Sequence, residues 1–169
     1  MWAKNKHQSA FTIVELLIVI VVIGILAAIT IVSFNGVQAR AYTAKAQADI
    51  ASLKQAIVMA RNNTGQVTGV ITGSWGTSGQ CMTLSSVTTK TSTCWTTYLT
   101  TLDKISTASG MNIRALADGR GYPYMLDENE SEGGVGNCTK DYMGSFRQPF
   151  EGAWVRDNNV EVETITAGC

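Results

Sequence analysis

The chain begins with a long apolar stretch and continues with an amphipathic one. No charged side chain occurs between Leu16 and Ala39. A helix over those 24 residues would be about 36 Å long, which exceeds the roughly 30 Å hydrocarbon core of a bilayer. The stretch therefore predicts a membrane-spanning helix. Glu15 is its anomaly, because a carboxylate in hydrocarbon costs on the order of 3 kcal/mol and needs a partner or a purpose.

Apolar side chains continue at helical spacing from Arg40 to Arg61. They recur at steps of three and four residues: Tyr42, Ala46, Ile50, Leu53, Ile57 and Ala60. No proline interrupts either segment, so we expect one helix from about Phe11 to Arg61. Asn62-Asn63-Thr64-Gly65 is typical of a helix end. Asn35-Gly36 has the poorest helix propensity, so a bend is expected there.

Beyond residue 61 the pattern changes. Residues 62–89 are uncharged and rich in Thr, Ser and Gly, which favours short strands and turns over helices. Residues 97–105 predict a short helix with Leu99, Leu102 and Ile105 on one side. Three pieces are strand-like, with a turn at residues 156–159 between the last two: Tyr122–Leu126, Ala153–Val155 and Val160–Ile165. The predicted fold class is α+β, a long helix packed on a small antiparallel sheet.

Charge sets the expected orientation. Lys4 and Lys6 are the only charged residues of the first ten, and the remainder has 11 basic and 13 acidic residues. A basic start before an apolar run stays in the cytoplasm, so the polar portion should be translocated. We therefore expect a leader at 1–10, an apolar helix at 11–34, its amphipathic continuation at 35–61 and an extracytoplasmic head at 62–169. A secretory signal cut near Ala27-Ala28 is the alternative, although Glu15 is unusual in such a signal.

All four cysteines lie in the expected head, as an extracytoplasmic location would allow: Cys81, Cys94, Cys138 and Cys169. Four cysteines permit three pairings, and the sequence cannot choose among them. We favour Cys81–Cys94 and Cys138–Cys169, because each would close a loop inside one polar region. A zinc site is the weaker hypothesis, since there is no C-x-x-C spacing and no nearby histidine.

The sequence offers little catalytic chemistry. Its single histidine is His7, in the leader, which removes Ser-His-Asp and Cys-His arrangements from the head. No phosphate-binding glycine motif is present. We predict neither an enzyme nor a cofactor.

Two features of the head could instead bind a ligand. The acidic residues Asp127, Glu128, Glu130 and Glu132 are weak calcium candidates, but they fail the EF-hand pattern and a solvated loop explains them better. Trp75, Trp95 and Trp154 could form a binding surface, although core positions are the commoner use of such residues. DNA binding would require a basic field that the mildly acidic head lacks.

The stretch Ala10-Phe11-Thr12-Ile13-Val14-Glu15-Leu16-Leu17-Ile18-Val19-Ile20, followed by Gly24-Ile25-Leu26-Ala27-Ala28, closely resembles the N-terminal segment of type IV pilins and secretion pseudopilins. The resemblance implies that a prepilin peptidase cuts between Ala10 and Phe11 and N-methylates Phe11. It implies that the helix stays in the membrane until an inner-membrane assembly platform inserts it into the core of an extracellular filament of pilin subunits.

The resemblance also gives Glu15 a partner. Cleavage would create a cationic α-amino group on Phe11, and Glu15 of a neighbouring subunit could pair with it in the apolar filament core. The expected function is a pilus subunit, with a pseudopilin of a secretion or DNA-uptake machine as the alternative and a membrane-anchored binding module as a third. The Cys138–Cys169 pair resembles the C-terminal disulfide loop of many pilins. The chain departs from the family pattern at two positions. It has Ala10 where family leaders usually end in glycine, and Val32 where many members have proline.

Overall fold

A computed structural model describes residues 11–73, 77, 79–127, 140–152, 155, 157, 160 and 163–166. The chain forms two compact units, residues 1–40 and 41–169. Helix α1 (Ile13–Thr64) runs through both, and Gly65 ends it with a φ of +66°. The prediction of one long helix is confirmed. The backbone stays helical through Asn35 and Gly36, so the predicted weak point does not interrupt α1.

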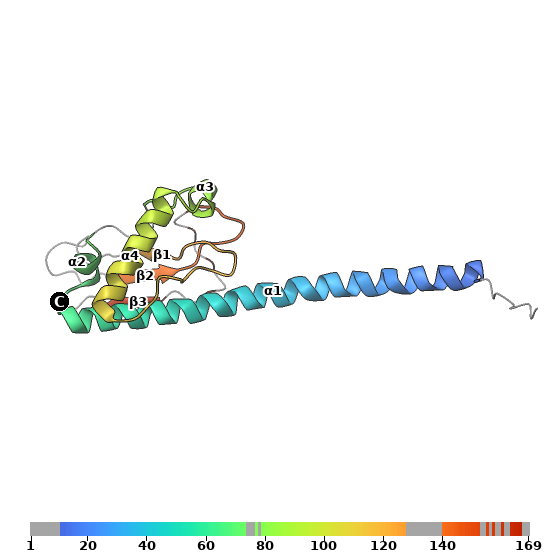
Figure 1. Cartoon of the computed structure of the whole chain (residues 1–169), viewed down its shortest axis with the longest axis horizontal. Helices are drawn as coiled ribbons and strands as arrows, with labels where there is room; N and C mark the ends of the chain where they lie inside the picture. The colour runs from blue at the N-terminus through green and yellow to red at the C-terminus, as the bar shows by residue number, and fades with distance from the viewer. Residues whose placement is uncertain are drawn as a thin grey trace, which may run out of the picture. The chain divides into compact units, whose positions relative to one another are not determined.

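The second unit adds three helices and three strands to the end of α1 (Figure 1). They are α2 (Thr68–Thr72), α3 (Leu84–Thr88), α4 (Thr93–Ser109), β1 (Met125–Asp127), β2 (Lys140–Gly144) and β3 (Glu163–Thr166). The strands form an antiparallel sheet in the order β1-β2-β3. The α+β prediction is confirmed.

The expectation that residues 62–89 avoid helices is wrong, because α2 and α3 lie there. Threonine favours strands because it is branched at Cβ, but the hydroxyl groups of threonine and serine also cap helices, as in α3. The Thr83 Oγ1 accepts a hydrogen bond from the Ser86 N–H, and the Ser86 hydroxyl accepts one from the Thr83 N–H. Helix α4 is longer than predicted at both ends. Ser92 caps its start, and Gly110, with a φ of +76°, ends it.

The strand predictions are partly wrong. Strand β2 was not expected, because its polar sequence hides a buried Asp141 and a buried Met143 on one face. Strand β3 pairs with β2, whereas most of the predicted hairpin at residues 153–165 lies outside the described residues. Val155 lies outside the strands, and its carbonyl accepts a hydrogen bond from the Arg147 N–H. Ala153 and Trp154 lie outside the described residues.

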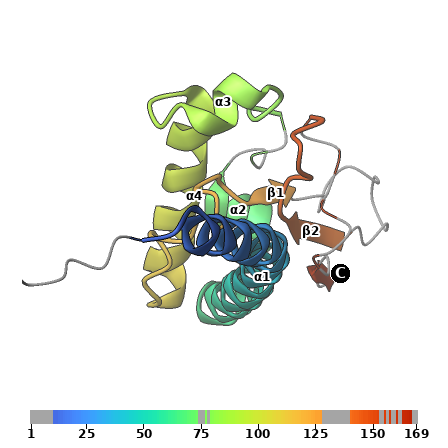
Figure 2. The same cartoon turned by 90° about the vertical axis from the view of Figure 1, so that its right-hand side faces the viewer.

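The core of the second unit lies between the end of α1, helix α4 and the sheet (Figure 2). Five of the six predicted α1 residues are buried there, and Tyr42 is half-buried. Helix α4 contributes Trp95, Tyr98, Leu102 and Ile105, and the sheet contributes Leu126 and Met143, which are opposite each other in the register. Alternation along β1 sends Met125 into a second cluster around Cys81 and Cys94.

Gly119 packs so closely on Tyr42 that Gly119→Ala should destabilise this unit. The added Cβ would overlap Cδ1 of Tyr42, whose ring lies under the Arg120 guanidinium at 4.8 Å and would have to shift. Overpacking of this kind costs about 1–3 kcal/mol in the free energy of unfolding. Denaturant titration of the full chain in detergent micelles measures it. Gly79→Ala, where the new Cβ meets nothing within 4 Å, is the control, and an equally small effect of both variants would contradict the packing.

Candidate assembly interface

The first half of α1 presents apolar side chains that nothing in the described chain covers. Between Phe11 and Val37, the large apolar side chains that the structure describes are between 48% and 84% exposed. Burial of one such side chain is worth about 1.5–3 kcal/mol, so exposing the whole row to water is strongly unfavourable. By length and composition, α1 can cross a membrane. This segment therefore needs a cover that the described residues do not supply.

Glu15 is not an unpartnered acid within the chain, because it forms a capping box with Thr12. Its Oε2 accepts hydrogen bonds from the Thr12 N–H at 2.8 Å and from the Thr12 hydroxyl at 2.9 Å. The Thr12 Oγ1 in turn accepts one from the Glu15 N–H at 3.2 Å. Thr12 immediately precedes the first helical residue, Ile13, and Glu15 occupies the third position of the helix. The spacing is that of the T-x-x-E motif.

The capping box lowers the free-energy cost of placing a carboxylate at the start of an apolar helix. Two hydrogen-bond donors from Thr12 and the positive end of the helix dipole stabilise the negative charge of Glu15. Both of these hydrogen bonds fall on Oε2. Among the described residues, no group donates a hydrogen bond to Oε1, so this oxygen can accept one from another chain. Thr12 was not among the predicted site residues, although T-x-x-E was legible in the sequence.

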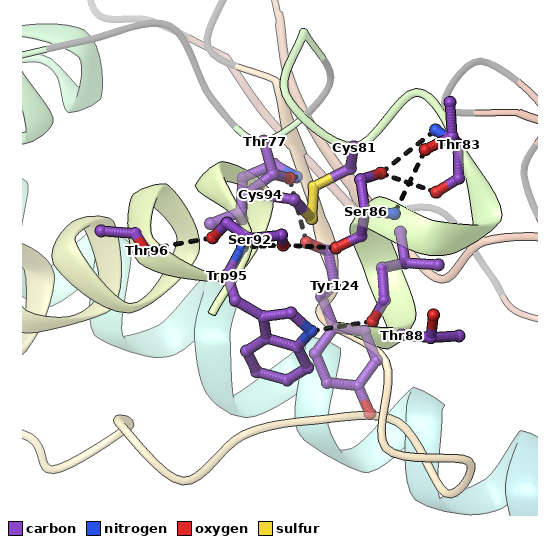
Figure 3. The surroundings of a disulfide bond; sticks show 12 residues. Thr77, Cys81, Thr83, Ser86, Thr88, Ser92, Cys94, Trp95, Thr96 and Tyr124 are labelled. Atoms are coloured by element: carbon purple, nitrogen blue, oxygen red, sulfur yellow. Dashed lines mark hydrogen bonds between the residues drawn. A yellow bond between two sulfur atoms is a disulfide. The ribbon is translucent and has the colours of Figure 1, made fainter. Parts of the chain in front are cut away.

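In the head, the predicted Cys81–Cys94 disulfide is confirmed (Figure 3). Both cysteines are fully buried, and the bond joins the turn before α3 to the first turn of α4. The Trp95 indole N–H donates to the Val87 carbonyl at 2.8 Å, and the Ser92 hydroxyl donates to the Ser86 carbonyl. These bonds hold α3 to α4.

Trp95 is also a core residue, as the commoner use of such residues predicted. Its side chain is buried, and its ring meets Tyr98 edge to face with centroids 5.7 Å apart. The second predicted disulfide, Cys138–Cys169, and Trp75 lie outside the described residues. Trp95 therefore gives no support to a tryptophan-lined binding surface.

The remaining predicted site residues do not form a cluster in the described chain. Phe11 is 83% exposed, whereas Ala10 lies outside the described residues. Asp127 ends β1 and pairs with Tyr142 in the sheet register. The other calcium candidates, Glu128, Glu130 and Glu132, lie outside the described residues. Within the described ranges, no group of three or more His, Cys, Asp or Glu residues could hold a metal ion.

Thr12→Val should open the first turn of α1, because it removes the hydroxyl that both donates to and accepts from Glu15. Loss of an N-cap costs about 1 kcal/mol, equivalent to roughly fivefold faster amide exchange in that turn. Hydrogen exchange of the full chain in micelles measures it. Thr12→Ser keeps the hydroxyl and should exchange as the parent does. Identical rates in Thr12→Val and the parent would show that the capping box does not stabilise the turn.

Comparisons with known proteins find similarity in the N-terminal part of the chain, which contains this segment. Residues 5–31 match the family model described as the prokaryotic N-terminal methylation motif. The chain is 38% identical over 56 residues to the type II secretion system core protein G of Aeromonas hydrophila. That alignment covers 33% of this chain and 39% of the relative, so the chain spans about two fifths of the relative's length. No solved structure matches. The N-terminal segment thus carries the methylation motif and is similar to that of a type II secretion core protein, which is consistent with the type IV pilin and pseudopilin family.

Proposed function

We propose that this chain is a structural subunit of an extracytoplasmic filament, without catalytic activity, that assembles through the first half of α1. The observation that carries the proposal is the row of exposed apolar side chains that starts at the Thr12–Glu15 capping box. A soluble protein would bury such a row in its own core. A permanent membrane anchor would need the apolar row and a helix cap, but an uncharged glutamine could cap the helix without placing a carboxylate there.

The same helix serves in two environments at different times. Before assembly, lipid covers the apolar segment, with the leader in the cytoplasm and the head outside. A prepilin peptidase then cuts between Ala10 and Phe11 and N-methylates Phe11. After extraction by an inner-membrane assembly platform, the helices of other subunits replace the lipid.

Glu15 is the residue that sets the register in this scheme. Its carboxylate, held by Thr12, would form an ion pair with the new α-amino group of Phe11 from a neighbouring subunit and accept a hydrogen bond from it. Attraction between the two charges is strong where no water screens it, and it offsets the cost of burying both. An apolar helix surface alone would allow neighbouring helices to slide, whereas a single buried pair favours one axial position.

A long pilus and a short secretion pseudopilus would both assemble through the first half of α1. The similarity to the type II secretion core protein G favours a pseudopilin as the second candidate. The expected Cys138–Cys169 loop favours a pilus subunit. Electron microscopy of cells with and without the chain separates them. Long surface filaments that disappear on deletion indicate a pilus, and a secretion defect without such filaments indicates a pseudopilus.

The processing step predicts the N-terminus of the mature chain. Mass spectrometry of the protein purified from membranes should find a chain that begins with N-methylated Phe11. An intact Met1 would contradict cleavage. A start near Ile29 would instead identify residues 1–28 as a secretory signal and would remove the assembly element from the mature protein.

Glu15→Gln should abolish filament assembly while leaving membrane insertion unchanged. Glutamine can still accept hydrogen bonds from Thr12, so the variant removes the charge and keeps the cap. The neighbour's amine would then be buried without its counter-charge, at a cost of about 3–5 kcal/mol per contact. Sheared filaments are quantified against membrane-bound subunit. Thr12→Ser, which keeps both the charge and the cap, is the control. Normal filament yield from Glu15→Gln would contradict the charge pair, and a membrane-anchored binding module would tolerate both variants.

A further inference from the structure

Two lysines of the second unit hold the two ends of one loop, residues 117–121. The Lys45 Nζ donates to the Ala117 carbonyl at 2.6 Å, and the Lys90 Nζ donates to the Gly121 carbonyl at 2.6 Å. Lys45 comes from α1, whereas Lys90 comes from the turn between α3 and α4. Two ammonium groups from distant parts of the sequence are therefore brought to the same short loop.

The loop adds a third cation, Arg120. Its guanidinium lies over the Tyr42 ring, 4.8 Å from the centroid, and Gly119 permits the close approach of the loop to that ring. Tyr42 follows Ala39, the last residue of the uncharged stretch, by three residues, or about 4.5 Å of helix. Chain connectivity thus keeps Tyr42 and Lys45 near the end of the uncharged stretch, and the contacts above bring Arg120 and Lys90 to the same loop. Lys45, Lys90 and Arg120 are here called the basic cluster.

The acids that face the basic cluster are covered, whereas two of its cations are partly open to solvent. Asp49 forms an ion pair with Lys45 and accepts a hydrogen bond from the Tyr124 hydroxyl at 2.7 Å. The Asp49 side chain is 17% exposed. Asp118 lies 3.9 Å from Arg120, and its side chain is 3% exposed. The side chains of Lys45 and Arg120 are 47% and 31% exposed. The surface that solvent meets here is therefore positive.

Asp118 serves the loop internally. Its Oδ1 accepts hydrogen bonds from the Arg120 and Tyr122 N–H groups at 2.9 Å and 2.7 Å. Burial raises the pKa of Asp118, although these hydrogen bonds act in the opposite direction. Its Oδ2 accepts no hydrogen bond and lies 3.9 Å from Arg120, so Asp118 balances part of the Arg120 charge. The solvent-exposed parts of Lys45 and Arg120 can still meet an external anion.

We propose that the basic cluster binds the phosphate groups of anionic phospholipids while the chain is still in the membrane. This inference rests on the membrane-anchored state of the proposed function. A guanidinium and two ammonium groups suit phosphate oxygens, and anionic membrane surfaces attract nearby Lys and Arg side chains. Binding would hold the head against the bilayer surface until extraction. The location beside the end of the uncharged stretch favours lipid over nucleic acid as the partner.

Amide exchange of the full chain in lipid nanodiscs tests the proposal. One set of discs contains phosphatidylcholine alone, and the other contains phosphatidylcholine and phosphatidylglycerol. Bound lipid stabilises the loop, so residues 117–122 should exchange several-fold more slowly in the anionic discs. Arg120→Gln should remove about fivefold of the lipid affinity, and Arg120→Lys should retain most of it. Equal exchange in the two lipids would overturn the proposal.

The matched control is Lys104→Gln. Lys104 is an exposed residue of α4 that donates to the Thr72 carbonyl, and α4 ends beside Asn63 near the other end of the head's part of α1. Its removal should leave the lipid-dependent protection of 117–122 unchanged. The same loss in Lys104→Gln and Arg120→Gln would indicate general surface charge and would overturn a localised site.

Three further outcomes would also overturn the assignment to lipid. Equal protection by inorganic phosphate in neutral discs would indicate a free anion. Protection by a short DNA duplex in neutral discs that is lost in Arg120→Gln would indicate nucleic acid. Failure of the chain to float with vesicles of either composition would overturn membrane anchoring itself. Flotation with no lipid-dependent protection would reject the basic cluster and leave the proposed assembly role intact.

Discussion

The apolar side chains of the first half of α1 must be covered, and the described part of the chain leaves them exposed. From Phe11 to Val37 they stand exposed on a helix that carries no charge from Leu16 to Ala39. Water is the one environment in which the segment is unfavourable. Lipid and the helices of other copies are both acceptable, and the free-energy difference between these two covers is small compared with the cost of water. A transfer from one to the other is therefore feasible.

The Thr12–Glu15 capping box makes the two environments compatible with a carboxylate. In a membrane, the hydrogen bonds from Thr12 would satisfy part of the acid and hold it at the helix end, where interfacial water would reach it. In a filament, the same arrangement would present a fixed acceptor to a neighbour's amine. The partner charge would exist only after the leader is removed, so processing would precede assembly for an electrostatic reason.

Long periodic features were predictable from the sequence, and features held together by distant residues were not. The spacing from Tyr42 to Ala60 identified the buried face of α1, because helical periodicity is a local property. Strand β2 escaped prediction because its inward-facing Asp141 is polar, and pairing with β1 and β3, not propensity, makes it a strand. Helix α3 escaped because its threonines and serines act as caps. For the candidate site, Glu15 stood out as an acid, whereas its bond to Thr12 depends on helix position.

We propose that the exposed face of α1 contacts lipid before assembly and other copies of the chain afterwards. A photo-crosslinking amino acid at Ile18, which is 56% exposed, tests it in cells. In cells that lack the assembly machinery, illumination should yield subunits joined to lipid. In cells that assemble filaments, it should yield dimers and higher multimers of the chain, and these should be lost in Glu15→Gln. Lipid adducts alone in sheared filaments, with no chain-to-chain product, would contradict the replacement of lipid by other copies of the chain.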